Sequence, residues 1–245
     1  MALALAAAAG GVDAVGWLSL GHVFSAHMSG NTVSMMSHAA FEEWGEAGRA
    51  AFVIVAFVSG LVIGAGTAAA TKRMRFRIGF SLALAIEAAM LFALMFVGEH
   101  ASGKGGVVPL RPAGTYYALV ALAAGSMGVQ SATLRRVGGS RVHTTFVTGA
   151  LVRVADGMVE FAEHVWHGLR LPVTARQSES LRAASRRAFF FGSLWVSYAT
   201  GGVASGLLVR IAGMRALALP LLVVSAATIV DARLARAGSP EAGAD

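Results

Sequence analysis

Long apolar runs separated by short polar segments are the feature that most limits how this chain can fold. Six runs are close to the length of about 20 residues that a helix needs to cross the hydrocarbon core of a bilayer. They cover residues 2–20, 50–70, 78–97, 116–134, 188–209 and 214–230. Charged residues make up only 13% of the 245 residues, whereas a soluble domain carries about 25%. The sequence therefore predicts an all-α integral membrane protein with about six full transmembrane helices, surrounded by the lipid bilayer.

The net charge of +7 would favour nucleic-acid binding in a soluble protein, but here membrane topology explains it better. We therefore expect no nucleic-acid partner. The chain has no Cys, which excludes disulfides and thiolate metal sites, and no pattern indicates a cofactor. Glu160, His164 and His167 share one helical face at metal-ligand spacing. Arg153 and Asp156 on the same face favour a solvated interfacial helix over a metal site.

Two segments interrupt the apolar pattern with small polar residues grouped around a glycine. The first break is 24–32 and the second break is 141–150. Lipid offers no hydrogen-bond partners, so such backbone is tolerated at membrane depth only when it is buried in protein or lines a wet cavity. We predict that the neighbouring stretches 33–44 and 144–169 are short broken or re-entrant segments. Paired breaks in matching positions of two halves are typical of a transporter binding site.

A weak internal repeat relates the two halves of the chain. Residues 11–14 match 128–132, residues 28–30 match 147–149, and residues 59–65 match 200–206. The first match places Gln130 opposite Asp13. The predicted organisation is a first membrane repeat (1–97), a linker (98–114), a second membrane repeat (115–235) and a disordered tail (236–245).

The basic residues indicate that the two repeats have inverted topology. Placing 72–77 in the cytoplasm gives that side the larger number of Lys and Arg, as the positive-inside rule requires. The residues then expected inside are 72, 73, 75, 77, 135, 136, 141, 170, 176, 182, 186, 187, 233 and 236, and those expected outside are 49, 104, 111, 210 and 215. This distribution requires that 144–169 does not cross fully. Each half then crosses three times, and an odd number of crossings orients the halves oppositely; seven or eight full spans is the alternative.

Asp13 and Glu87 are acidic residues inside predicted spans, where a charge is costly and usually marks an ion or substrate path or is paired. Both are candidate coupling groups. The predicted substrate-binding residues are Asp13, His27, Ser29, Gly30, Asn31, Thr32, Gln130, Thr144, Thr145, Thr148 and Gly149. Helix N-termini that begin after the two glycines would present free N–H groups, which favours a polar or anionic ligand. The alternative is that the hydroxyl groups only cap the short helices and that Asp13 holds the broken backbone in shape.

Two pairs of motifs give the chain a family resemblance. The first pair consists of 11–14 followed by 22–32, and the second pair consists of 128–132 followed by 144–149. The chain resembles the bacterial YoaK family, also called the DUF1275 or UPF0700 transmembrane proteins. In that family G-x-x-D-A precedes F-x-A-x-x-T-G-N, and a later G-x-x-N/Q-A precedes T-x-x-T-G. Ser29 stands where the family usually has Thr, which keeps the hydroxyl. The resemblance covers almost the whole chain and implies an inner-membrane protein, but it supplies no substrate.

These features together favour a small secondary transporter of the bacterial inner membrane. It would bind a small polar or anionic solute near the midplane, between the two breaks, with proton coupling through Asp13. The alternatives are a channel, which needs a continuous polar pore, and a membrane enzyme, for which only His22, His27 and Asp13 are close to a convergent set. A homo-oligomer is compatible with the sequence.

Overall fold

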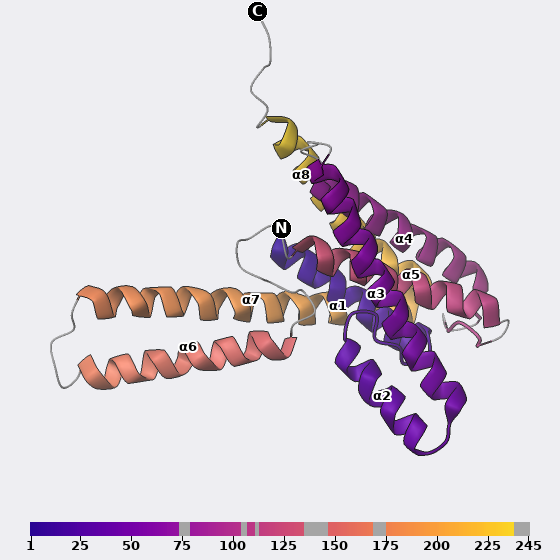
Figure 1. Cartoon of the computed structure of the whole chain (residues 1–245), viewed down its shortest axis with the longest axis horizontal. Coiled ribbons are helices and arrows are strands. Elements are labelled where there is room, and N and C mark those ends of the chain that lie inside the picture. Colours follow the sequence, from indigo (N-terminus) through magenta and orange to yellow (C-terminus); the bar gives the residue numbers. More distant parts are fainter. Residues whose placement is uncertain (74–78, 104–106, 111–112, 135–146, 169–174, 238–245) are drawn as a thin grey trace, which may run out of the picture.

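The structure is a computed structural model, and it describes residues 1–73, 79–103, 107–110, 113–134, 147–168 and 175–237. These residues form helices joined by short connections (Figure 1). The helices are α1 (Ala2–Ser19), α2 (Met28–Ala40), α3 (Trp44–Arg73), α4 (Gly79–Ala101), α5 (Ala113–Leu134), α6 (Val147–Gly168), α7 (Ala175–Ala212), the 3-10 helix η1 (Gly213–Leu217) and α8 (Ala218–Ala237).

Each predicted span lies on a helix, namely α1, α3, α4, α5, α7 or α8. Within the described residues, four helical stretches are long and apolar enough to cross a membrane: Ala2–Ser19, Trp44–Arg73, Phe80–Ala101 and Leu181–Arg236. The last stretch runs through α7, η1 and α8. The expected all-helical membrane architecture is therefore confirmed at the level of long apolar helices, and six full crossings stay a prediction.

α1 and α5 are the most buried helices of the bundle. Every residue of α5 from 123 to 133 is buried, including the polar Ser126, Gln130 and Ser131. α1 is buried over most of its length from Leu5 to Gly16. A helix that is enclosed by protein on all sides does not need the uniformly apolar surface of a helix that faces lipid. This explains why polar residues are tolerated in these two helices.

Glycines bring α1 against α7 and α3 against α5, and these are the two most extensive helix contacts among the described residues. Gly10 on α1 approaches Tyr198 on α7, and Gly60 on α3 approaches Gly125 on α5. At both positions a Cβ atom would overlap a backbone carbonyl oxygen. Small residues let membrane helices approach closely and gain van der Waals contact, which holds helices together where lipid tails supply little hydrophobic driving force.

α4 and α8 are antiparallel. Ser81 at the start of α4 donates a hydrogen bond of 2.5 Å to Asp231 Oδ2 near the end of α8. At the other end of α4, Glu99 forms an ion pair of 2.9 Å with Arg215 in η1, just before α8 begins. α1 and α5 also run in opposite directions. The first turn of α5 lies beside the end of α1, where the Tyr116 hydroxyl donates to the Leu20 carbonyl oxygen at 3.1 Å.

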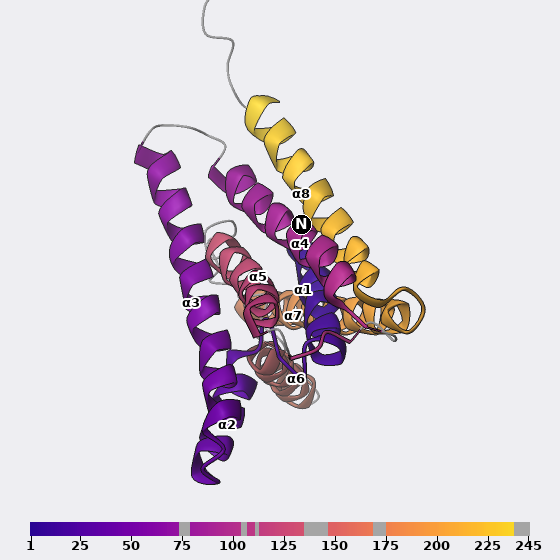
Figure 2. The same cartoon turned by 90° about the vertical axis from the view of Figure 1, so that its right-hand side faces the viewer.

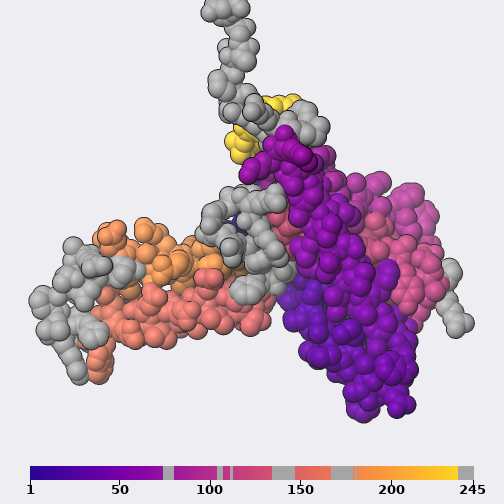
Figure 3. All heavy atoms as spheres, in the orientation of Figure 1, coloured from indigo at the N-terminus to yellow at the C-terminus, as the bar shows by residue number. Residues whose placement is uncertain are grey.

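α2 and α6 each fold back along the helix that follows. Among the described helices, α2 contacts α3 and α6 contacts α7. The α6–α7 hairpin projects from the rest of the bundle, as Figures 1 and 3 show. Arg153 lies over the Phe191 ring, with its Cζ 4.8 Å from the ring centroid, and Arg187 pairs with Glu160 at 3.6 Å. The polar face of α6, which the sequence predicts to be solvated, therefore faces α7 in part.

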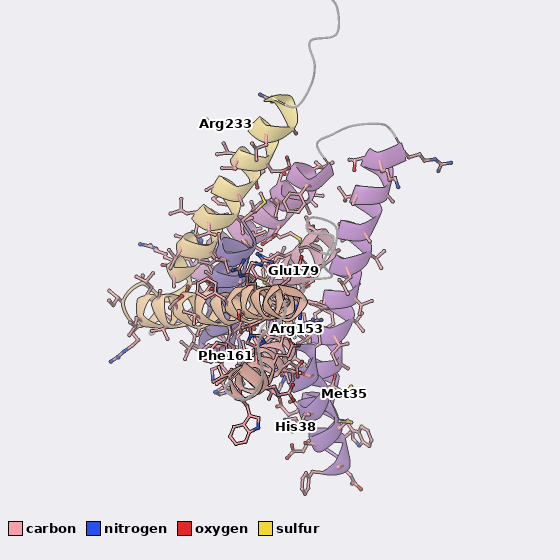
Figure 4. The ribbon with its side chains drawn as sticks, turned by 90° about the vertical axis from the view of Figure 1, so that its left-hand side faces the viewer. Met35, His38, Arg153, Phe161, Glu179 and Arg233 are labelled. Atoms are coloured by element: carbon pink, nitrogen blue, oxygen red, sulfur yellow. The ribbon has the colours of Figure 1, made fainter. Side chains whose placement is uncertain are left out.

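Charged residues gather at opposite ends of the molecule. Lys72 and Arg73 end α3, and Arg233 lies in the last turns of α8 at the same end (Figures 2 and 4). The turn between α2 and α3, which carries Glu42 and Glu43, lies at the other end (Figure 2). The predicted orientation requires such a separation of charge, and which end faces the cytoplasm stays a prediction.

Several predictions concern residues outside the described ranges. Those residues are Arg75, Arg77, Lys104, Arg111, Arg135, Arg136, Arg141, Thr144, Thr145, Arg170 and most of the tail 236–245.

Candidate functional site

The first break folds back onto α1 through two backbone features. Gly21 and His22 have φ values of +70° and +62°, so the chain reverses immediately after α1. The Ala26 N–H then donates to Asp13 Oδ1 at 2.7 Å. Gly16 leaves room for this return, because a Cβ there would stand 2.7 Å from the Ser25 hydroxyl oxygen. Asp13 therefore fixes the position of the break, as the structural alternative predicted.

Asp13 also belongs to a cluster of three ionisable side chains. The Tyr198 hydroxyl donates to Asp13 Oδ2 at 2.5 Å, and His27 Nδ1 lies 2.6 Å from the same oxygen. The Tyr198 hydroxyl oxygen is 3.2 Å from His27 Nδ1. Asp13 is only 4% exposed. A carboxylate, an imidazole and a phenol thus converge from α1, from the residue preceding α2, and from α7.

The charge of this cluster depends on a single proton. With a neutral imidazole and an ionised carboxyl the three groups carry one negative charge, and with a protonated imidazole they carry none. The short Nδ1–Oδ2 distance favours an ion pair when His27 is protonated. A proton on His27 therefore changes the cluster from a net negative charge to a neutral ion pair.

Asn31 and Thr32 are bonded to the backbone of the break itself. Asn31 Nδ2 donates to the Phe24 carbonyl oxygen at 2.6 Å, and Asn31 Oδ1 accepts from the Phe24 N–H at 3.3 Å. The Thr32 hydroxyl donates to the Met28 carbonyl oxygen at 2.8 Å. Asn31 therefore braces the break, whereas the Thr32 bond lies within α2. Of the remaining predicted residues here, Ser29 is exposed and Gly30 packs under the Phe24 ring.

The described parts of the two breaks do not meet. α2 and α6 make no contact with each other, because each lies along its own long helix. At the start of α6, Thr148 is exposed and Gly149 is buried. Thr144 and Thr145 lie outside the described residues. The expectation of one cage formed by both breaks is therefore not supported by the described residues, and the ionisable cluster forms around the first break alone.

The comparisons with known proteins agree with the family resemblance. The family model described as "Protein of unknown function (DUF1275)" matches residues 1–230. The chain belongs to this family. It is similar to the UPF0700 transmembrane protein YoaK of Bacillus subtilis (strain 168), with 27% identity over 148 residues. That match covers 60% of this chain and 61% of the relative, so it spans about three fifths of the relative's length. No solved structure matches.

The ionisable cluster of this DUF1275 member borders a groove between α1 and α7. The groove has a volume of about 530 Å³, and Asp13 and Tyr198 are its polar lining residues. Trp17 and Phe24 also line it, and their rings are stacked with centroids 4.7 Å apart. The rest of its lining is small or aliphatic and consists of Gly10, Ala14, Leu18, Ala199, Gly202, Val203 and Gly206. The cluster is therefore reached from a largely apolar surface.

Glu87 forms a second polar centre with Gln130. The Glu87 side chain is 0% exposed, and its Oε1 accepts a 2.8 Å hydrogen bond from Gln130 Nε2. Its other oxygen, Oε2, has no hydrogen-bond partner among the described residues. An ionised carboxylate in such a place would be very costly, so the neutral acid is the favoured form. Gln130 thus belongs to this centre and not to the cluster around Asp13.

Sequence reasoning found Asp13, His27 and Glu87 but missed two partners. Tyr198 stands in an apolar helix whose neighbours give no sign of a distant acid, although it lies three residues before the repeated Gly201. The partner of Glu87 was also missed, because Gln130 had been assigned to the substrate cage. Both partnerships join helices that are far apart in the sequence, and a spacing pattern within one helix does not reveal them.

Proposed function

We propose that this chain is a small multi-pass secondary transporter of the bacterial inner membrane, which carries a small polar solute and couples its movement to a proton. One observation carries the proposal. The hydrogen bond from Tyr198 to Asp13 joins the second half of the chain to the first, and it lies inside an ionisable cluster. A rocking motion between the halves would break or form this bond, so solute access and proton binding would be linked.

An inverted repeat is supported by the directions of the helices. α3 runs parallel to α5, because Phe52 contacts Tyr117 and Gly64 contacts Val129. α1 runs parallel to α7, because Ala7 near the start of α1 contacts Gly201 and Leu18 near its end contacts Gly206. Since α1 and α5 are opposed and α4 and α8 are antiparallel, each helix of one half opposes its counterpart in the other. This is the arrangement on which alternating access depends.

The glycine contacts also indicate a register for the repeat. Gly10 approaches the backbone of Tyr198 and Gly202, and Gly128 approaches the backbone of Phe57 and Leu61 in the same way. If Gly10 corresponds to Gly128, Ser131 corresponds to Asp13. This register differs by one residue from the sequence-based match, which placed Gln130 opposite Asp13. It also places Phe57 opposite Tyr198. The repeat-related position, formed by Ser131 and Phe57, therefore lacks both the acid and the phenol, so the cluster has no equivalent there.

The charge of the cluster favours a neutral or positively charged solute over an anionic one. An anion would meet the Asp13 carboxylate in a region of low dielectric constant, where like charges repel strongly. The N-terminus of α2, which was expected to attract an anion, is covered by Phe24, whose ring would be about 3 Å from a Cβ at Gly30. Of the two predicted kinds of solute, we therefore keep the polar one in the proposal and drop the anionic one.

Proton flux in proteoliposomes tests the proposal. Solutes that stabilise the purified protein in a thermal-shift screen would be added outside vesicles that contain a pH-sensitive dye. We expect at least one solute to drive proton movement, and we expect Asp13→Asn to abolish it because the variant cannot carry the charge. Glu179→Gln is the matched control, since Glu179 is exposed on α7 and lies outside the cluster. Equal proton flux with Asp13→Asn and with the unmodified protein would refute the coupling role.

A further inference from the structure

The groove between α1 and α7 combines an apolar surface with one acidic residue. Asp13 is the charged residue among its described lining residues, and Tyr198 supplies the hydroxyl group beside it. Its volume of about 530 Å³ lies within the range of about 300–1,000 Å³ that is usual for small-molecule sites. A ligand of this size would therefore meet a carboxylate on one side and hydrocarbon on the others.

The floor of the groove is flat because its residues are small. Gly10 and Ala14 on α1 face Gly202 and Gly206 on α7. Gly206 has only van der Waals neighbours, with Leu18 Cδ1 3.7 Å from the position of a Cβ atom. Close helix packing requires glycine only where the two backbones touch, as they do at Gly10. At Gly206 a Cβ atom would make only ordinary van der Waals contacts, so close packing does not require glycine there.

The electrostatics of the groove favour a cation. While His27 is unprotonated, the Asp13 carboxylate accepts hydrogen bonds only from neutral groups, on Ala26, Tyr198 and His27, and these do not cancel its charge. In a region of low dielectric constant, that uncompensated charge attracts a positive ligand over several ångströms. The stacked rings of Trp17 and Phe24 add π faces, which bind organic cations.

We propose that this groove binds a hydrophobic organic cation, with its charge beside Asp13 and its apolar body between Trp17 and Val203. The inference rests on the proposed function, and it replaces the small polar solute proposed there with a cation whose only polar part is its charged centre. The other conceivable occupants of such a groove are a lipid acyl chain and a helix of a second copy of this chain. Neither of them would make use of the carboxylate.

A pair of ions with the same shape and opposite charge tests the inference directly. Tetraphenylphosphonium and tetraphenylborate would be titrated against the purified full chain in detergent by equilibrium dialysis. We expect saturable binding of tetraphenylphosphonium, and binding of tetraphenylborate at least tenfold weaker. With Asp13→Asn the preference for the cation should fall at least tenfold, because the charge that selects it is gone. Equal binding of the two ions by the unmodified protein would overturn the inference.

A second pair of variants keeps the test informative if Asp13→Asn fails to fold. Val203→Phe fills the groove from an exposed position that is not one of the cluster residues. Leu207→Phe adds a similar ring at another exposed position of α7 that does not line the groove. We expect Val203→Phe to weaken tetraphenylphosphonium binding at least tenfold and Leu207→Phe to leave it within twofold. Unchanged binding in Val203→Phe, with the helical circular dichroism signal preserved, would count against the groove.

The failures of the two proposals are distinguishable. Charge-selective binding without any solute-driven proton flux would leave the inference standing and remove the transporter. Proton flux driven by another solute, without binding of tetraphenylphosphonium, would remove the inference and leave the transporter. A co-purified lipid that the cation does not displace, or a dimer that Val203→Phe dissociates in the absence of any cation binding, would assign the groove to the other occupants and overturn the inference.

Discussion

Asp13 is bonded to three donors that come from different parts of the chain, and this arrangement gives it two roles at once. The Ala26 N–H fixes the first break on α1, and the Tyr198 hydroxyl attaches α7. His27 adds a group that can hold a proton. An acid with only a structural role would not need a histidine at 2.6 Å. For this reason we interpret the residue as both a structural anchor of the break and the charge that defines the site.

The energetic contribution of the cluster can be measured at Tyr198. Tyr198→Phe removes the hydroxyl that donates a hydrogen bond of 2.5 Å to the buried Asp13 carboxylate. Hydrogen bonds to charged groups contribute about 1.5–3 kcal/mol, so we expect the free energy of unfolding to fall by about 2 kcal/mol. Tyr117→Phe is the control, because its ring packs on Phe52 and no described residue bonds its hydroxyl. The measurement is unfolding in mixed detergent micelles followed by circular dichroism. Equal losses in the two variants would contradict a specific bond at Tyr198.

The helices were largely predictable because their signals are local. Each apolar run predicted a helix that the structure contains, since a long, mainly apolar run in lipid has few other ways to satisfy its backbone. A short helix beside the first break was also expected, but α2 begins at Met28, inside the predicted break, and not after Gly30. What the sequence did not reveal is which helices touch. The contact of α1 with α7 depends on glycines whose partners lie about 190 residues away.

At the scale of the helices, glycine packing gives a direct test on α3. Gly60→Ala places a Cβ atom against the Gly125 carbonyl, so α3 and α5 must separate. Overpacking of this kind costs about 1–3 kcal/mol, and we expect a loss of stability in that range. Gly66→Ala on the same helix meets nothing within 4 Å and should be neutral or stabilising by up to about 1 kcal/mol, because alanine is the better helix former. Thermal unfolding in detergent measures both. Similar melting temperatures for the two variants would show that the close α3–α5 contact is absent.

For the whole molecule, the separation of charged ends gives a prediction about orientation. Because the chain has no Cys, single cysteines can be introduced without removing any native ones. Glu43 lies at the acidic end and Arg233 at the basic end, and both side chains are exposed. The positive-inside rule places the basic end in the cytoplasm. We therefore expect a membrane-impermeant maleimide to label Glu43→Cys in intact spheroplasts and to label Arg233→Cys only after permeabilisation.

A further pair of cysteines extends this test to the relation between the halves. Lys72 lies at the C-terminal end of α3 and Arg210 near the C-terminal end of α7, and both residues are exposed. If the halves are inverted, these corresponding ends lie on opposite sides of the membrane, so Arg210→Cys should be labelled in intact spheroplasts and Lys72→Cys should not. Labelling of both from the same side would mean that the halves run in the same sense. A rocking motion about the Tyr198–Asp13 contact would then have no symmetric counterpart, and alternating access by exchange of two inverted halves would have to be abandoned.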